Sequence, residues 1–192
     1  WSGIVEFGEN VFQNATGIVE FTVGENCTKL GERLFALTTG LQKVTINSTK
    51  ITKIPEKAFF GCEQLTEVIV KSPIVNIGAN AFATNAYADQ GGKKMVIKEF
   101  DFSHVAVIDD KAFLKVLRID CDVNLPVVTK IGESAFNEVT IPGKVDLGTE
   151  LESVLDYAFQ KSTIGTLVLH ENTNVFGKEP FGAIGTVELA EG

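Results

Sequence analysis

Apolar residues recur along this chain at a nearly fixed interval. Residues 51–82 contain the pattern twice, 23 residues apart: Ile51, Ile54, Ala58 and Phe59, then Ile74, Ile77, Ala81 and Phe82. A period in the twenties is typical of a solenoid, in which each repeat forms one coil and buries its apolar face against the next coil. The pattern therefore predicts stacked turns rather than a conventional globular core.

One phenylalanine marks each predicted turn, with spacings of 23, 24, 23, 31, 23, 23 and 22 residues. The position five residues before each of these phenylalanines is apolar in every turn. We therefore expect one domain over residues 1–192, with about eight turns anchored at Phe12, Phe35, Phe59, Phe82, Phe113, Phe136, Phe159 and Phe181.

Each turn has a similar internal order. Glycine stands four residues before the phenylalanine in five turns, which indicates a bend. An acidic residue usually follows, as suits the N-terminal end of a short helical turn. After the phenylalanine, apolar residues alternate as in a strand. The expected inward pairs are Phe21/Val23, Val44/Ile46, Val68/Val70, Phe100/Phe102, Ile119/Cys121, Val145/Leu147, Leu167/Leu169 and Val187/Leu189.

These features predict an α/β repeat solenoid. Equivalent strands of successive turns should pair in parallel on one face, and short helical turns and loops should form the other face. The long interval between Phe82 and Phe113 contains an insertion at about residues 83–95, with Gly91 and Gly92 beside two lysines. This insertion is either a tolerated loop or a contact finger for a partner, with Tyr87 at its tip.

Composition narrows the possible partners. The formal net charge of -8 repels polyanions, so we expect neither nucleic acid nor anionic membranes as ligands. Apolar runs all fall well short of the roughly 20 residues that span a bilayer, so we expect no direct membrane insertion. The chain opens with Trp1 rather than Met. We therefore expect a processed chain whose signal peptide has been removed.

Catalytic chemistry finds little support. The two histidines, His104 and His170, lie almost three predicted turns apart, and neither belongs to a nucleophile, phosphate-loop or zinc motif. We therefore predict a protein without enzymatic activity, catalytic residues or a cofactor. Cys27, Cys62 and Cys121 all replace apolar or small residues in different columns, so we expect three buried free thiols and no disulfide.

The outward strand positions form a candidate binding face. They read Thr22, Thr45, Ile69, Asp101, Asp120, Asp146, Val168 and Glu188, so that three successive turns carry an aspartate in one expected column. Charged residues flank this column at Glu99, Arg118, Asp122 and Lys144. Three interpretations remain open: a solvated sheet face, a binding face for a basic protein segment, or a calcium site built from carboxylate oxygens.

The repeated run Ile-x-x-Ile-Gly/Pro-x-x-Ala-Phe-x-x-Cys-x-x-Leu-x-x-Val-x-Val resembles the BspA-like (Treponema pallidum-type) leucine-rich repeat family. Residues 51–82 match best, including Cys62 three residues after its phenylalanine. The resemblance implies a right-handed leucine-rich-repeat coil that is exported to the cell surface or secreted. Relatives in this family are similar to adhesins that bind host matrix proteins or other cells.

Two functions therefore compete. The first is a recognition module that adheres to a host or neighbouring-cell protein through the strand face and the insertion. The second is a structural spacer within a larger surface protein, with no ligand of its own. The sequence indicates neither the identity of a protein partner nor the oligomeric state.

Overall fold

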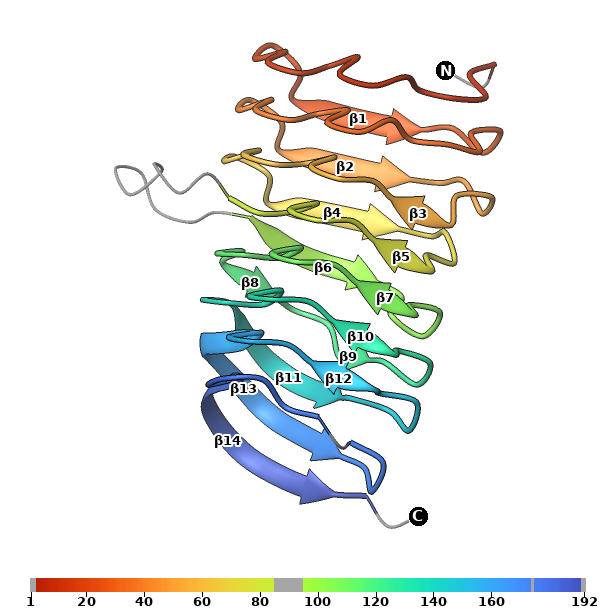
Figure 1. Ribbon diagram of the computed structural model, residues 1–192. Coiled ribbons are helices and arrows are strands. Elements are labelled where there is room, and N and C mark those ends of the chain that lie inside the picture. The colour runs from red at the N-terminus through yellow and green to blue at the C-terminus, as the bar shows by residue number, and fades with distance from the viewer. Residues whose placement is uncertain (1–2, 85–94, 174, 191–192) are drawn as a thin grey trace.

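The computed structural model describes residues 3–84, 95–173 and 175–190 (Figure 1). These residues form a parallel β-solenoid of about seven turns, because eight phenylalanine positions are separated by seven steps. The count is slightly below the expected eight. Two parallel sheets run along the coil, and Figure 1 shows their strands stacked from the N-terminal to the C-terminal end.

The larger sheet has the order β1-β2-β4-β6-β8-β11-β13-β14, with β9 also paired to β11. Its strands are β1 (Glu20–Val23), β2 (Lys43–Ile46), β4 (Glu67–Val70), β6 (Val96–Phe100), β8 (Arg118–Ile119), β9 (Val123–Asn124), β11 (Thr140–Asp146), β13 (Phe159–Leu169) and β14 (Phe181–Leu189). The smaller sheet has the order β3-β5-β7-β10-β12. Its two-residue strands are β3 (Lys53–Ile54), β5 (Asn76–Ile77), β7 (Val107–Ile108), β10 (Lys130–Ile131) and β12 (Ser153–Val154).

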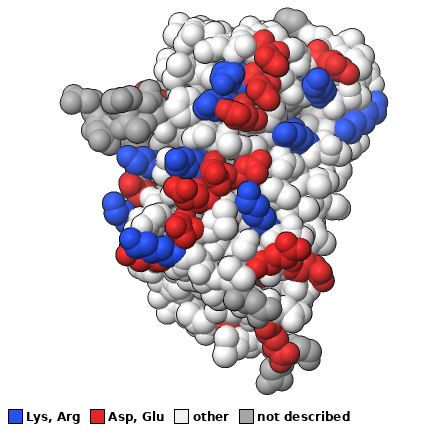
Figure 2. All heavy atoms as spheres, in the orientation of Figure 1, with Lys and Arg blue, Asp and Glu red and all other residues white. Residues whose placement is uncertain are grey.

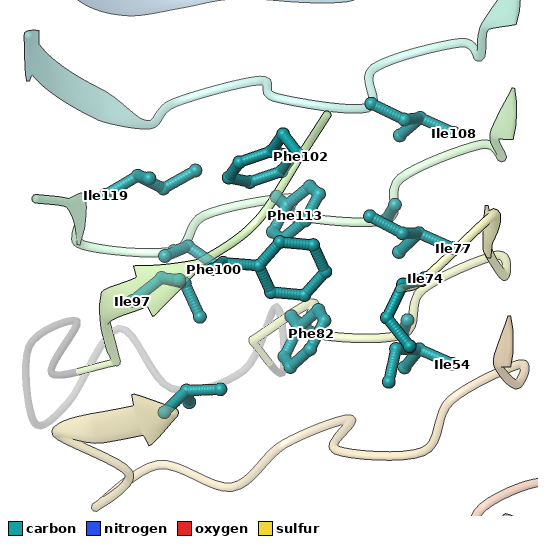
Figure 3. Packing of buried hydrophobic residues seen from close by; sticks show 14 of the residues in the cluster. Ile54, Ile74, Ile77, Phe82, Ile97, Phe100, Phe102, Ile108, Phe113 and Ile119 are labelled. Atoms are coloured by element: carbon teal, nitrogen blue, oxygen red, sulfur yellow. The ribbon is translucent and has the colours of Figure 1, made fainter. Parts of the chain in front are cut away.

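A single column of phenylalanine rings fills the interior between the sheets. Successive rings from Phe12 to Phe181 stack with centroids 4.7 to 5.7 Å apart and interplanar angles of 22° or less. Figure 3 shows Phe82 and Phe113 in this column, between isoleucines of the larger sheet and isoleucines of the smaller sheet. The expectation of one aromatic ring per turn, packed in a common core, is therefore confirmed.

The expected helical turns are wrong, because the described residues contain no helix. The residue two positions before the phenylalanine has a positive φ in all eight turns, from Asn10 to Glu179. A left-handed residue interrupts a helix, because continuous right-handed angles are needed for its hydrogen bonds. The N–H groups instead reach the next turn. Phe35 donates to the carbonyl of Ala58 at 2.8 Å, and Phe59 donates to that of Ala81 at 2.8 Å.

The strand alternation is confirmed in the first three turns. There, both residues of each expected inward pair are buried, in the pairs that begin at Phe21, Val44 and Val68. It is wrong at the last strand. Val187 is 54% exposed and Leu189 is 78% exposed, because β14 has a described neighbour on one side only.

The three cysteines are free, as expected, but they are not equally buried. Cys27 and Cys62 are fully buried, and the Cys62 thiol donates to the carbonyl of Phe35 at 3.0 Å. Cys121 is only half-buried, which corrects the expectation of three buried thiols. It lies in the irregular stretch between β8 and β9, where the strand is interrupted.

Candidate protein-binding surface

The outward face of the larger sheet does not carry the expected aspartate column. Ile69 of β4 pairs with Glu99, not with Asp101, and a register shift lies between Val68 and Ile69. Further along the coil, Asp146 pairs with Asn124 of β9, and a second register shift lies between Ile141 and Lys144.

Asp120 falls between β8 and β9, outside either strand. The three aspartates therefore occupy three different positions relative to the sheet, and the column was predicted wrongly. Bulges add residues to one strand only, so the alternation of inward and outward residues along each strand does not by itself give the register between strands. Within the described parts of the chain, no three His, Cys, Asp or Glu side chains come together to hold a metal ion. The calcium interpretation thus loses the geometry on which it depended.

Charged residues from two successive turns do lie together on this face. Lys144 Nζ lies 3.2 Å from Asp146 Oδ2, and the backbone N–H of Lys144 donates to Asp122 Oδ1 at 2.9 Å. These three residues, with Val123 and Asn124, line a shallow pocket of ≈ 240 Å³. The structure thus brings together Asp122, Lys144 and Asp146, three of the seven residues proposed for the face.

His170 adds a further contact to this cluster. Its Nε2 lies 2.7 Å from Asp146 Oδ1, and the two side chains are only 20% and 19% exposed. Burial alone would raise the pKa of Asp146, but hydrogen bonds with His170, Gly148 and Lys144 outweigh it and lower that pKa. Through its contact with His170, the Asp146 carboxylate therefore links the sixth turn to the seventh. Sequence reasoning missed this pairing, although His170 stands 24 residues after Asp146, about one period later.

The other proposed residues form separate local pairs. Arg118 Nε forms an ion pair with Asp120 within the same turn. Asp101 accepts a hydrogen bond from the backbone N–H of Ser103 at 2.9 Å, and its Oδ2 lies 3.4 Å from His104 Nδ1. Hydrogen bonding with Ser103, and then the nearby His104, lowers the pKa of the Asp101 carboxyl. Glu99 is exposed in β6. Tyr87, the proposed loop contact, lies outside the described residues.

A second group of charges on the same sheet was also missed. Glu67 of β4 lies 2.7 Å from Lys43 of β2 and 3.5 Å from Lys98 of β6, so that it bridges three consecutive turns. The signal was present in the sequence, because Lys43 and Glu67 are 24 residues apart and opposite in charge.

Figure 2 shows that basic and acidic side chains are interspersed over the visible face, while the C-terminal end is mostly uncharged.

Comparisons with known proteins agree with this architecture. The model of the BspA type leucine-rich repeat region matches residues 2–90 and 93–188 in six copies. Among curated proteins, none matches the sequence. The described residues contain no helix that is both long and apolar enough to cross a membrane.

Two solved structures are similar. A leucine-rich cell surface protein from Faecalibacterium prausnitzii is 16% identical, with a TM-score of 0.52 over 96% of this chain. A leucine-rich repeat protein from Bacteroides ovatus is 15% identical, with a TM-score of 0.36 over 97% of this chain. The chain spans 64% of the length of each.

Proposed function

Because the chain belongs to the BspA-type leucine-rich repeat family, we propose that it is a non-enzymatic recognition module, secreted or at the cell surface, that adheres to host or neighbouring-cell proteins. The binding face is the outward side of the larger sheet around Glu99, Asp101, Arg118, Asp120, Asp122, Lys144 and Asp146. The observation that carries the proposal is the pocket where Asp122, Lys144 and Asp146 converge from neighbouring turns.

Physical considerations support this face. Parallel strands stacked about 4.8 Å apart present side chains from many turns on one rigid surface, so that a partner can contact several turns at once. The described face mixes both charge signs, and such patterns favour specificity and orientation more than raw affinity. Names of similar proteins support the location, since one of them is a cell surface protein.

The spacer alternative rests on a different observation. Arg118 is paired with Asp120, and Lys144 is paired with Asp146, so that much of the charge on this face is already neutralised within the chain. A face whose charges are balanced within the chain needs no partner to neutralise them.

Binding to immobilised extracellular-matrix proteins tests the proposal. The parent chain should bind at least one of them in surface plasmon resonance. Lys144→Glu should lose most of this binding, because it reverses the charge beside the pocket. The matched control is Lys130→Glu on β10 of the smaller sheet, which should bind as the parent does. Equal loss in both variants would contradict the proposed face, and no binding by the parent would favour the spacer.

A further inference from the structure

The larger sheet is closed to different degrees at its two ends. At the N-terminal end, the rings of Phe7 and Phe12 lie 5.7 and 4.9 Å from the ring of Phe21 in β1, and Phe21 is only 7% exposed. At the C-terminal end, the inward side chains of β14 remain in solvent, and Val187 and Leu189 are 54% and 78% exposed. The described coil therefore has one covered end and one uncovered apolar end.

β14 also has a free backbone edge. Among the residues that the structure describes, this nine-residue strand pairs with β13 alone, and Figure 1 shows it as the last ribbon of the stack. Ala190 donates its N–H to the carbonyl of Leu169 at 2.9 Å. Because the backbone groups of successive residues point to opposite sides of a strand, those of Leu189 point to the free edge. The strand contains no lysine or proline, which commonly block such edges against pairing.

Charge indicates which partner suits this edge. The formal net charge of the chain is -8, so two copies repel each other over most of their surfaces. β14 contains only one charged residue, Glu188, and Figure 2 shows that the C-terminal end is mostly uncharged. Two copies therefore approach each other with the least repulsion at this end. A strongly charged partner would gain few ion pairs there.

We infer that β14 pairs antiparallel with β14 of a second copy of this chain, so that two coils join at their C-terminal ends. The pairing is centred on Gly185, the middle residue of the strand. Glu188 then lies opposite Gly182 of the second copy, so that the two glutamates do not face each other. Leu189 lies opposite Phe181 of the second copy, and the two apolar side chains cover one another.

Head-to-tail stacking is the less favourable arrangement. The N-terminal end offers only the four residues of β1, and its core side is already covered by Phe7 and Phe12. Contact between unlike ends would also leave a free end on every added copy and produce filaments, whereas pairing of like ends is two-fold symmetric and closes at two copies.

The pairing has a consequence for the adhesion face. Antiparallel strands of one continuous sheet are related by a two-fold axis normal to that sheet, so the outward faces of both larger sheets lie on the same side of the dimer. Two copies of the proposed face would then contact one surface together, which raises the apparent affinity without any new contact. This consequence rests on the proposed function, whereas the pairing itself does not.

Sedimentation equilibrium of the 192-residue chain tests the pairing. Over a dilution series, the parent chain should change from the mass of one copy to the mass of two. Added sodium chloride should strengthen the association, because it screens the repulsion between two negatively charged copies. At the higher concentrations, hydrogen exchange should slow at the Leu189 amide and stay unchanged in β1.

Leu189→Lys provides the decisive variant. The side chain of Leu189 is largely in solvent, so the variant should fold as the parent does. A lysine on the strand edge should weaken dimer formation at least about tenfold. The matched control is Val5→Lys, at an exposed apolar residue of the N-terminal end, which should associate as the parent does. Both substitutions change the net charge equally, so a difference between them reports the position of the contact.

Each opposite result would overturn the proposal. A chain that keeps the mass of one copy at every concentration has no such interface. Association of Leu189→Lys equal to that of the parent, or an equal loss in Val5→Lys, would place the contact elsewhere. Weaker association in salt would indicate a contact between charged surfaces, and masses that grow beyond two copies would identify head-to-tail stacking.

Discussion

The two halves of the coil share one interior but reach their strands by different routes. In the first three turns, a strand of four residues begins eight residues after the ring, and a loop fills the interval. Thr38 and Cys62 occupy this loop and donate to the phenylalanine carbonyl of the preceding turn, at 2.7 and 3.0 Å. In the last two turns, strands of 11 and 9 residues begin at the phenylalanine itself.

A column of glycines makes the second route possible. A Cβ atom on Gly165 would lie 2.1 Å from the Pro142 carbonyl oxygen, and one on Gly185 would lie 2.7 Å from that of Gly165. Figure 1 shows β13 and β14 as long bent ribbons through this region. The period of about 23 residues therefore determines where the rings stack, whereas small residues outside the core determine how the backbone reaches the sheet.

The common interior predicts equal, large losses in both halves. Phe59→Ala and Phe136→Ala should each lower the free energy of unfolding by about 4 kcal/mol. Both rings are fully buried and stacked on two others, at 5.5 and 5.2 Å for Phe59 and at 4.9 and 4.7 Å for Phe136. Urea denaturation measures the two values. A difference of more than about 2 kcal/mol between them would show that the halves do not share one core.

The glycine column predicts the next largest effect. Gly165→Ala should destabilise the protein by about 3 kcal/mol, because its new Cβ atom meets backbone rather than a flexible side chain. The matched change in the first half is Gly17→Ala, where no atom lies within 4 Å of the new Cβ. That change should stay within about 0.5 kcal/mol. Equal thermal stability of the two variants would contradict the role given to the column.

Acid sensitivity should also differ between the halves. The pKa of Asp146 is lowered in the folded state, so the stabilisation that it provides is present above its unfolded pKa of about 3.9 and is lost as the pH falls through the folded value. Asp146→Asn should therefore cost about 1.5 kcal/mol at pH 7 and progressively less below about pH 4. Denaturant titrations at several pH values measure this.

Glu67 provides the comparison in the first half. The hydrogen bond from Lys43 lowers the pKa of Glu67, which has the same sign of pH dependence. Its side chain is more exposed than that of Asp146, and water screens exposed ion pairs. Glu67→Gln should therefore change stability less than Asp146→Asn at pH 7, and the reverse order would contradict the assignment.

The sequence predicted the rings and the first strands because both depend on burial, which repeats with the period. Phe35 and Phe59, for example, lie where the count from their neighbours places them. The sequence did not predict the backbone conformation at the positions where that conformation sets no requirement on residue type. The left-handed residues Arg33, Lys57 and Tyr157 differ in type, so that no side-chain signal separates these turns from a short helix.

The candidate site was harder to predict for the same reason. Asp101, Asp120 and Asp146 were aligned as the residues between the expected inward pairs, but the structure pairs Ile69 with Glu99 and Asp146 with Asn124. Ion pairs between turns are easier to read from the sequence. A pair such as Lys43 and Glu67 requires only that residues of opposite charge stand one repeat period apart. The pairing of Asp146 with His170 required knowledge of where β13 ends.

The smallest effect concerns thiol reactivity and leaves stability unchanged. Burial raises the pKa of the Cys62 thiol to about 12, so almost no thiolate is present at pH 8. Cys27 is fully buried as well, whereas Cys121 in the second half is only half-buried. Iodoacetamide under native conditions should therefore modify Cys121 first, as peptide mass spectrometry would show. Earlier labelling of Cys62 would mean that the loop of the first half opens more readily than the interrupted strand of the second.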